Sequence, residues 1–192
     1  MPRIKRIVKV GAPHHITQRG NYSQTIFENE QDYKIYQKHI EKYSQEYYLS
    51  ILAYCLMPNH VHFIAIPQKE NSLACTFRLT HMRYSQYFNN KHCTKGQLWQ
   101  GRYYSCLLNK PHFHAAIRYV EKNPVRASLA KEVHEWEWSS ARAHLGMAKS
   151  SISLKNPTDL LNFQDWNDFL KTENDEKIID RIKKHTKKGQ EI

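Results

Sequence analysis

Apolar and polar positions follow two different periods along the first two thirds of the chain, and together these periods predict an α+β fold. Residues 14–19 alternate loosely and end at a Gly-Asn turn signal, which predicts a first strand. Residues 29–47 repeat tyrosine and isoleucine at spacings of three and four, which predicts a helix. Residues 49–57 and 60–66 are β-rich runs separated by a Pro-Asn turn, so they predict a hairpin.

The same alternation of helix and strand continues after the hairpin. Ser72 can cap a helix that runs to about residue 90, and LWQGRYYSCLL, residues 98–108, predicts a fourth strand. A further helix opens at Lys110 and should end at Asn123, because the proline that follows disfavours a helical conformation in the residue before it. This order predicts a ferredoxin-like two-layer α/β sandwich, with one antiparallel sheet and its helices packed on one face.

The chain of 192 residues suggests one domain with a small appendage. Ser139 can cap a short helix that ends at Gly146, and residues 147–157 are polar. We therefore expect a domain over residues 1–146, followed by a linker and a helical, basic C-terminal tail over residues 147–192.

Composition narrows the class of protein and of partner. No apolar run approaches the ~18 residues that span a membrane, and the basic N-terminus lacks a secretory apolar stretch, so we expect a cytoplasmic protein. Lysine and arginine number 29 against 18 acidic residues, and the net charge of +11 favours polyanionic partners. Aromatic residues make up 12% of the chain; they suit stacking on single-stranded bases, although most are expected to pack the core.

The stretch CLMPNHVHFIAI places two imidazoles in a strand that is otherwise apolar. His60 and His62 are two residues apart and therefore share one face of the strand, while Val61 and Phe63 point to the other face. Two neutral imidazoles that converge suit a divalent cation; the alternative is a hydrogen-bonded structural pair. Nucleotide hydrolases of the histidine-triad type need a third histidine at position 64, where this chain has isoleucine.

The stretch RYVEKNPVRA carries a second candidate pair. Tyr119 and Asn123 are four residues apart on a predicted helix, which places them on one face, ~5–6 Å apart at their Cβ atoms. This spacing pairs a nucleophile with a metal-binding amide oxygen, and the phenol needs a nearby cation because its ordinary pKa is about 10. Arg118, Lys122 and Arg126 flank the pair and could hold phosphates. The alternative is an amphipathic helix with an ordinary Asn-Pro stop.

Taken together, these stretches resemble the HUH single-tyrosine transposases, and most of all their REP-associated tyrosine transposase branch. The resemblance spans residues 13 to about 146 and rests on motifs in one order: HHITQRGN, AYCLMPNHVHFIAIP, LWQGRYYS, YVEKNPVRASLA and WEWSSARAHLG. The chain departs from the family at Ser128, where members often have glycine, and at Ala141, where they often have a bulky residue. Neither position touches the proposed chemistry.

The resemblance implies a role for each candidate residue. His60 and His62 match the two HUH metal ligands, Asn123 matches the third ligand, and Tyr119 matches the nucleophile. The ion would be Mg²⁺ or Mn²⁺. The family cuts and rejoins single-stranded DNA that contains hairpins, such as REP-like elements or insertion-sequence ends, through a 5′-phosphotyrosine link. This implies a bacterial, nucleoid-associated enzyme that acts as a monomer or homodimer.

The basic residues expected to contact the DNA backbone are Arg3, Lys5, Arg6, Arg19, Arg78, Arg83, Arg102, Arg118, Lys122 and Arg126. Of these, the resemblance places Arg102 near the active site. Two alternatives to a transposase stay open: a nickase of the replication-initiator or relaxase type, and a domesticated transposase that binds hairpin DNA without cutting it.

Overall fold

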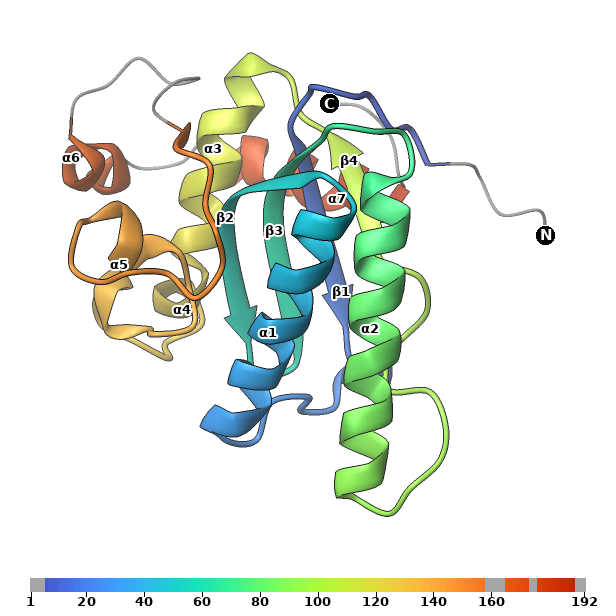
Figure 1. Ribbon diagram of the computed structural model, residues 1–192. Helices are drawn as coiled ribbons and strands as arrows, with labels where there is room; N and C mark the ends of the chain where they lie inside the picture. Colours follow the sequence, from blue (N-terminus) through green and yellow to red (C-terminus); the bar gives the residue numbers. More distant parts are fainter. Residues whose placement is uncertain (1–5, 158–164, 173–175, 189–192) are drawn as a thin grey trace.

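The computed structural model describes residues 6–157, 165–172 and 176–188 of the chain (Figure 1). The strands are β1 (His14–Arg19), β2 (Leu49–Met57), β3 (His60–Pro67) and β4 (Tyr104–Leu107). The α-helices are α1 (Glu30–Glu46), α2 (Ser72–Lys91), α3 (Lys110–Glu121), α4 (Asn123–Arg126), α5 (Ala141–His144), α6 (Trp166–Lys171) and α7 (Glu176–Lys188), and the short 3-10 helices are η1 (Asn21–Ser23) and η2 (Val133–Glu135). None of the helices in these ranges is long and apolar enough to cross a membrane.

The strands form one antiparallel sheet in the order β2-β3-β1-β4. The sequence order β1-α1-β2-β3-α2-β4 with this strand order is the ferredoxin-like arrangement, so the predicted fold class is confirmed. Strand register decides which side chains share a face, and β1 pairs with β3 so that Thr17 lies opposite His62 and Arg19 lies opposite His60.

One face of the sheet carries α1 and α2, which lie side by side in front of it in Figure 1. Val61 and Phe63 point into this layer and are fully buried against helix residues such as Tyr36 and Phe77. Burying each of these large apolar side chains contributes about 1.5–3 kcal/mol. The odd-numbered positions of β3 therefore anchor the sheet, as the strand period predicts.

The opposite face of the sheet carries α3 and α7. The sequence predicted helices on one face only, so the cover on this second face is a difference from the predicted two-layer sandwich. The α3 helix packs on β2 and β3, and α7 packs on β4 and β1. Ile179 and Ile182 of α7 are fully buried in the same cluster as Ile64 and Cys106 of the sheet. The C-terminal segment thus completes a second core, and the boundary after residue 146 stays a prediction.

The fourth strand is shorter than the run of residues 98–108 predicts, because β4 comprises only Tyr104–Leu107. The residues before it form a loop whose apolar side chains are anchors. Trp99 is buried among the aromatic residues between α1, α2 and the sheet, and its indole nitrogen donates to the backbone oxygen of His81 at 3.1 Å. Trp99 also forms a single antiparallel bridge with Gly20, so the loop pairs briefly with the end of β1 before the regular strand begins at Tyr104.

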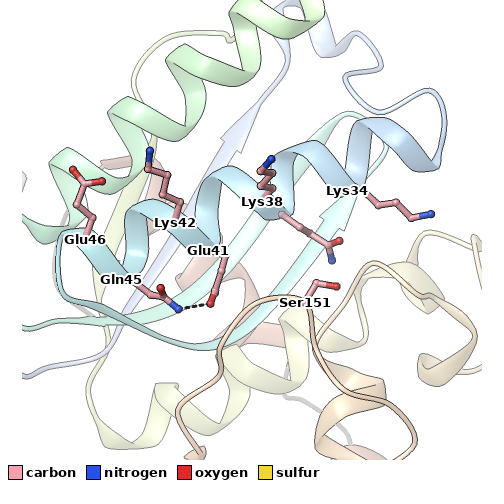
Figure 2. A pocket seen from close by; sticks show the side chains of 8 residues that line it. Lys34, Lys38, Glu41, Lys42, Gln45, Glu46 and Ser151 are labelled. Atoms are coloured by element: carbon pink, nitrogen blue, oxygen red, sulfur yellow. Dashed lines mark hydrogen bonds between the residues drawn. The ribbon is translucent and has the colours of Figure 1, made fainter.

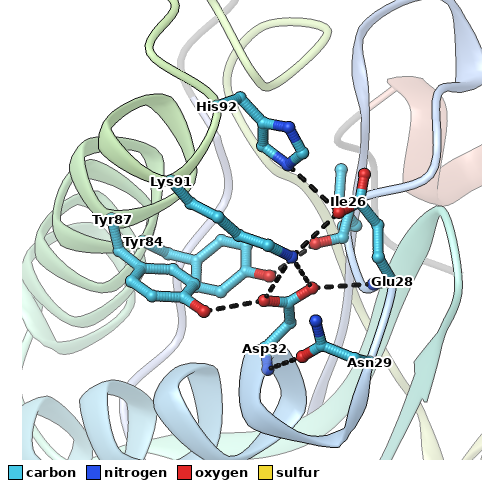
Figure 3. A network of polar contacts seen from close by, with 8 residues as sticks. All are labelled: Ile26, Glu28, Asn29, Asp32, Tyr84, Tyr87, Lys91 and His92. Carbon is cyan, nitrogen blue, oxygen red and sulfur yellow. Dashed lines mark hydrogen bonds and ion pairs between the residues drawn. The ribbon is translucent and has the colours of Figure 1, made fainter.

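A buried ion pair joins the start of α1 to the end of α2 (Figure 3). The Asp32 carboxylate is inaccessible to solvent and lies 2.8 Å from the Lys91 ammonium. It also accepts hydrogen bonds from the Tyr87 hydroxyl and the Glu28 backbone amide, both at 2.8 Å. Burial opposes ionisation of Asp32, yet these donors outweigh it and hold the pKa of this carboxyl below its usual value.

We expect Asp32→Asn to lower the free energy of unfolding at pH 7 by about 2 kcal/mol, because hydrogen bonds to a buried charge are lost. A depressed pKa means that this stabilisation is present above the unfolded value of about 3.9 and is lost as the pH falls through the lower folded value. Urea titrations between about pH 7 and pH 3 check this, since the difference between wild type and variant should shrink toward acid. A difference that stays constant with pH would contradict the assignment.

Candidate active site

His60 and His62 stand at the beginning of β3, directly after the hairpin turn, and both project toward the α3 layer. Their ring centroids lie 4.9 Å apart with the planes nearly perpendicular. His62 is 5% exposed, whereas His60 is partly open to solvent. The expectation that the two imidazoles share one face is therefore confirmed.

The α3 helix brings Tyr119 to the same place. Its start is set by Asn109, whose side chain accepts a hydrogen bond from the backbone amide of His112, and by a proline in the first turn. Tyr119 lies above the sheet with its ring centroid 5.5 Å from that of His62. The phenol and the two histidines, far apart in sequence, thus meet on one side of β3.

Asn123 lies one turn beyond Tyr119. The α3 helix ends at Glu121, two residues before the predicted stop at Asn123, and the chain re-enters helical geometry at once in α4, whose first residue is Asn123 itself. Lys122 between the two helices keeps φ −82° and ψ −2°, so the spacing from Tyr119 to Asn123 stays close to one helical turn. Asn123 is 9% exposed, and its amide nitrogen is buried without a hydrogen-bond partner among the described residues.

Basic side chains surround the phenol. Burial is the largest influence and holds the pKa of Tyr119 above its usual value, while the nearby Asn123 amide and the charges of Arg126 and Arg19 act in the opposite direction. The Arg126 guanidinium and the Lys183 ammonium each lie 5.8 Å from the centre of the Tyr119 ring. These charges favour a phosphate anion beside the hydroxyl and offset part of the effect of burial on the pKa of the phenol.

Both histidines are neutral at physiological pH. Burial, together with the nearby Arg19, lowers the pKa of His60 to about 4. Burial lowers the pKa of His62 well below its ordinary value, and the neighbouring imidazoles of His60 and His15 act in the same direction. Neutral imidazoles are the form that ligates metal ions.

The types of donor atom at this site suit a divalent cation. The Nδ1 atom of His60 lies 2.6 Å from the Asn59 amide oxygen, which only accepts, so His60 keeps its proton on Nδ1 and a lone pair on Nε2. No group of three or more His, Cys, Asp or Glu side chains in the described ranges could hold a metal ion. The candidate set is therefore the imidazoles of His60 and His62 with the amide of Asn123. Two nitrogen donors and one oxygen donor suit Mn²⁺ at least as well as Mg²⁺ and leave positions for water and phosphate.

Three residues of this site were missed by sequence reasoning: His15, Lys183 and Thr186. His15 shares the sheet face of His62 because β1 lies beside β3, and its Nε2 atom lies 3.0 Å from His62 Nδ1. Lys183 and Thr186 belong to α7. The strand alternation of HHITQR could have placed His15 on one face with Thr17 and Arg19, but only the register shows what lies diagonally opposite.

Two of the predicted DNA contacts lie beside the candidate site. Arg19 ends β1 opposite His60, and Arg126 lies near the Tyr119 ring while it forms an ion pair with Glu176 of α7 at 2.9 Å. Arg102 is exposed in the loop before β4, and this loop is tied to the end of β1 by the Gln100 amide, which donates to the Arg19 carbonyl at 2.9 Å.

The other predicted contacts lie elsewhere. Arg78 and Arg83 are exposed on α2, which covers the opposite face of the sheet from Tyr119. Arg118 is half-buried with its guanidinium 4.9 Å from the Phe169 ring, and Lys122 is partly buried between α3 and α4. Arg6 donates twice to the Tyr103 carbonyl. The remaining two, Arg3 and Lys5, lie outside the described residues.

An open groove runs along the outer side of α1, and Figure 2 shows its lining. Lys34, Lys38 and Lys42 alternate there with the carboxylates of Glu41 and Glu46. The α1 helix covers the face of the sheet that carries Val61 and Phe63 rather than the histidines, so this groove is separate from the candidate site.

The comparison with protein families decides the identity of the chain. The model of the family described as "Transposase IS200 like" matches residues 10–123, which is more than half of the sequence and includes His60, His62, Tyr119 and Asn123. The chain belongs to the IS200-like transposase family. The resemblance drawn from the sequence motifs is confirmed.

One solved structure shares the fold of this IS200-like transposase. A REP-associated tyrosine transposase bound to a REP hairpin superposes with a TM-score of 0.63 at 19% identity, covering 81% of this chain and 96% of that one. A putative transposase from Deinococcus radiodurans matches with a TM-score of 0.43 at 18% identity, covering 64% of this chain and 97% of that one. No curated protein matches the sequence. The first structure shows that the fold is that of a REP-associated tyrosine transposase.

Proposed function

We propose that this transposase is a metal-dependent endonuclease that nicks and rejoins single-stranded, hairpin-containing DNA through a covalent bond to Tyr119. The observation that carries the proposal is the meeting of Tyr119 with His60, His62 and Asn123 on one side of β3. A phenol, two neutral imidazoles and a buried amide gathered on one side of a strand supply the nucleophile and the ligand types that metal-assisted phosphoryl transfer needs.

The metal-binding part of the proposal assigns His60, His62 and Asn123 as ligands of Mg²⁺ or Mn²⁺. When bound, the ion would supply positive charge to a non-bridging oxygen of the scissile phosphate. The low pKa values of the histidines keep their lone pairs available without competition from protons.

Tyr119 is the proposed nucleophile. Its hydroxyl loses a proton to solvent, its oxygen bonds to phosphorus, and the bond from phosphorus to the 3′ oxygen breaks. The released 3′ oxygen takes up a proton from solvent and becomes a 3′-hydroxyl, and the other fragment is joined to Tyr119 as a 5′-phosphotyrosine. A phosphodiester is exchanged for another of similar energy, so attack by a 3′-hydroxyl reverses the step without an external energy source. Arg126, Arg19 and Lys183 would favour the phenolate and hold the phosphate.

The proposed substrate is single-stranded DNA that carries a hairpin. The solved REP-associated transposase is bound to a REP hairpin, and this chain shares its fold. The net charge of +11 supports a nucleic-acid partner of this kind. Arg19 and Arg126 are the proposed backbone contacts closest to the phenol.

A denaturing gel tests the proposal. We expect the full chain, incubated with labelled hairpin oligonucleotides and Mn²⁺, to yield a protein–DNA adduct that survives denaturant. The adduct should vanish with EDTA and return when excess Mn²⁺ is added, because its formation depends on the ion. Binding to hairpins without any adduct across a panel of flanking sequences would instead identify a DNA-binding protein that does not cut.

A further inference from the structure

The C-terminal helix α7 reaches the candidate metal site through a chain of buried hydrogen bonds. Thr186 is 1% exposed and its hydroxyl oxygen lies 2.8 Å from Nδ1 of His15. His15 is also 1% exposed, and its Nε2 lies 3.0 Å from Nδ1 of His62. The rings of His15 and His62 are nearly parallel, 10° apart, so the two imidazoles meet edge to edge through their nitrogens. Thr186, His15 and His62 therefore form a continuous line from α7 across β1 to β3.

The direction of each hydrogen bond follows from the Thr186 hydroxyl. Its oxygen lies 2.7 Å from the carbonyl oxygen of Ile182, one turn earlier on α7, and a carbonyl can only accept. The single hydroxyl proton must point to Ile182, since two acceptors would otherwise face each other at this distance. Both lone pairs of the hydroxyl then receive donors, namely the His15 Nδ1–H and the thiol of Cys106 at 3.0 Å.

The proton positions on the two histidines are fixed in turn. A neutral His15 that donates from Nδ1 has a bare Nε2, which must accept. The proton between the two rings therefore belongs to Nδ1 of His62. A neutral His62 with its proton on Nδ1 carries its lone pair on Nε2, which matches the arrangement that Asn59 imposes on His60.

We propose that Thr186 and His15 are positioning residues that keep His62 in the tautomer whose Nε2 is free to bind a divalent cation. This inference rests on the proposed function, because it takes His62 as a metal ligand. It also excludes His15 as a third ligand, since its Nε2 is occupied by the His62 N–H. A ligand histidine held by a hydrogen bond from its other nitrogen is a general feature of metal sites, and loss of the partner weakens metal binding about 10- to 100-fold.

The tertiary placement gives α7 a role that its sequence does not show. Ile179 and Ile182 anchor the helix in the core, and Arg126 is paired with Glu176 at its first turn. These contacts hold Thr186 in register with His15. The helix therefore acts on the metal site through one hydroxyl group, without contributing a ligand itself.

We call the line of hydrogen bonds from Thr186 through His15 to His62 the relay. Thr186→Val tests it, because valine keeps the shape of threonine and removes the hydroxyl. Without an acceptor beside Nδ1, His15 can move its proton to Nε2 and donate it to His62, which forces the His62 proton onto its own Nε2. We expect the ¹⁵N spectrum of the metal-free wild type to show His62 protonated on Nδ1, and that of the variant to show a large share protonated on Nε2. The signal is assigned by its loss in His62→Gln. We expect the dissociation constant for Mn²⁺, measured by electron paramagnetic resonance of the free ion, to rise about tenfold.

Two matched variants separate the relay from packing. Thr186→Ser restores the hydroxyl and should return both the tautomer and the Mn²⁺ affinity close to wild type. Cys106→Ala removes the other donor to the same hydroxyl and should change neither. If the serine and valine variants lost Mn²⁺ affinity equally, the loss would come from altered packing rather than from the missing hydroxyl, and the proposal would be overturned.

The wild-type spectrum decides the matter even where a variant fails to fold. Wild-type His62 protonated on Nε2 would overturn the relay directly. Wild-type protein that has the expected tautomer but does not bind Mn²⁺ would contradict the proposed metal site while supporting the relay. Mn²⁺ binding that Thr186→Val leaves unchanged would overturn the relay and leave the metal site standing.

Discussion

We expect Tyr119→Phe to abolish the covalent protein–DNA adduct while hairpin DNA binds with nearly wild-type affinity. The substitution removes a single oxygen atom, and the phenylalanine ring fills the same space, which is 6% exposed and bordered by the rings of His15 and His62. Loss of the nucleophile itself should lower the rate of adduct formation by more than about 1000-fold. Binding should persist because the basic residues around the phenol are unchanged.

The adduct assay and a fluorescence anisotropy titration on the same hairpin measure the two effects. Tyr48→Phe is the matched control, since Tyr48 is 55% exposed just before β2 starts, at the end of the sheet remote from the hairpin turn. This control should form adduct at the wild-type rate. Adduct in Tyr119→Phe at the wild-type yield would assign the nucleophile to another residue, and loss of DNA binding in step with the adduct would point to a structural effect.

The second large effect is expected for His60→Ala. His60 begins β3 and is partly open to solvent, so its removal leaves the buried layers of the sheet in place. One of three proposed ligands is lost, and with it much of the charge stabilisation that a bound ion would provide. Several kcal/mol of such stabilisation correspond to a loss of about 100- to 1000-fold in the rate of adduct formation.

The expected pattern has two parts. Adduct formation at a fixed, low Mn²⁺ concentration should fall by this factor, and part of it should return as Mn²⁺ is raised, because the remaining ligands still bind weakly. His39→Ala serves as the control, since His39 lies on α1 across the sheet. A His60→Ala protein that forms adduct at the wild-type rate in limiting Mn²⁺ would remove His60 from the set of ligands.

Local periodicity was enough to predict much of the site. Strand residues two apart share a face whatever the rest of the chain does, so the placement of His60 and His62 together followed from the sequence. The same reasoning holds for Tyr119 and Asn123, four apart on a helix, although the chain crosses from α3 to α4 between them. The order of the motifs then predicted the family, which the match over residues 10–123 confirms.

Local patterns failed where the surroundings of a residue decide its role. The run of residues 98–108 has the composition of a strand, but only Tyr104–Leu107 form a regular ladder with β1, while Trp99 makes a single bridge to Gly20 and packs into the aromatic cluster under α1 and α2. Composition alone does not distinguish an apolar side chain that anchors a loop from one that faces a core within a strand.

The sequence by itself determined the sheet, the pairing of the two histidines, and the helical pair of phenol and amide, because each depends on spacing within one element. Only the tertiary structure decided that His15 meets His62, since this contact depends on the register of β1 against β3. The tertiary structure alone placed Thr186 and Lys183 at the site. The sequence of an amphipathic helix shows which of its faces is apolar, but it does not show which apolar surface of the protein that face covers. Here that surface was the second face of the sheet, where the residues of the metal site lie.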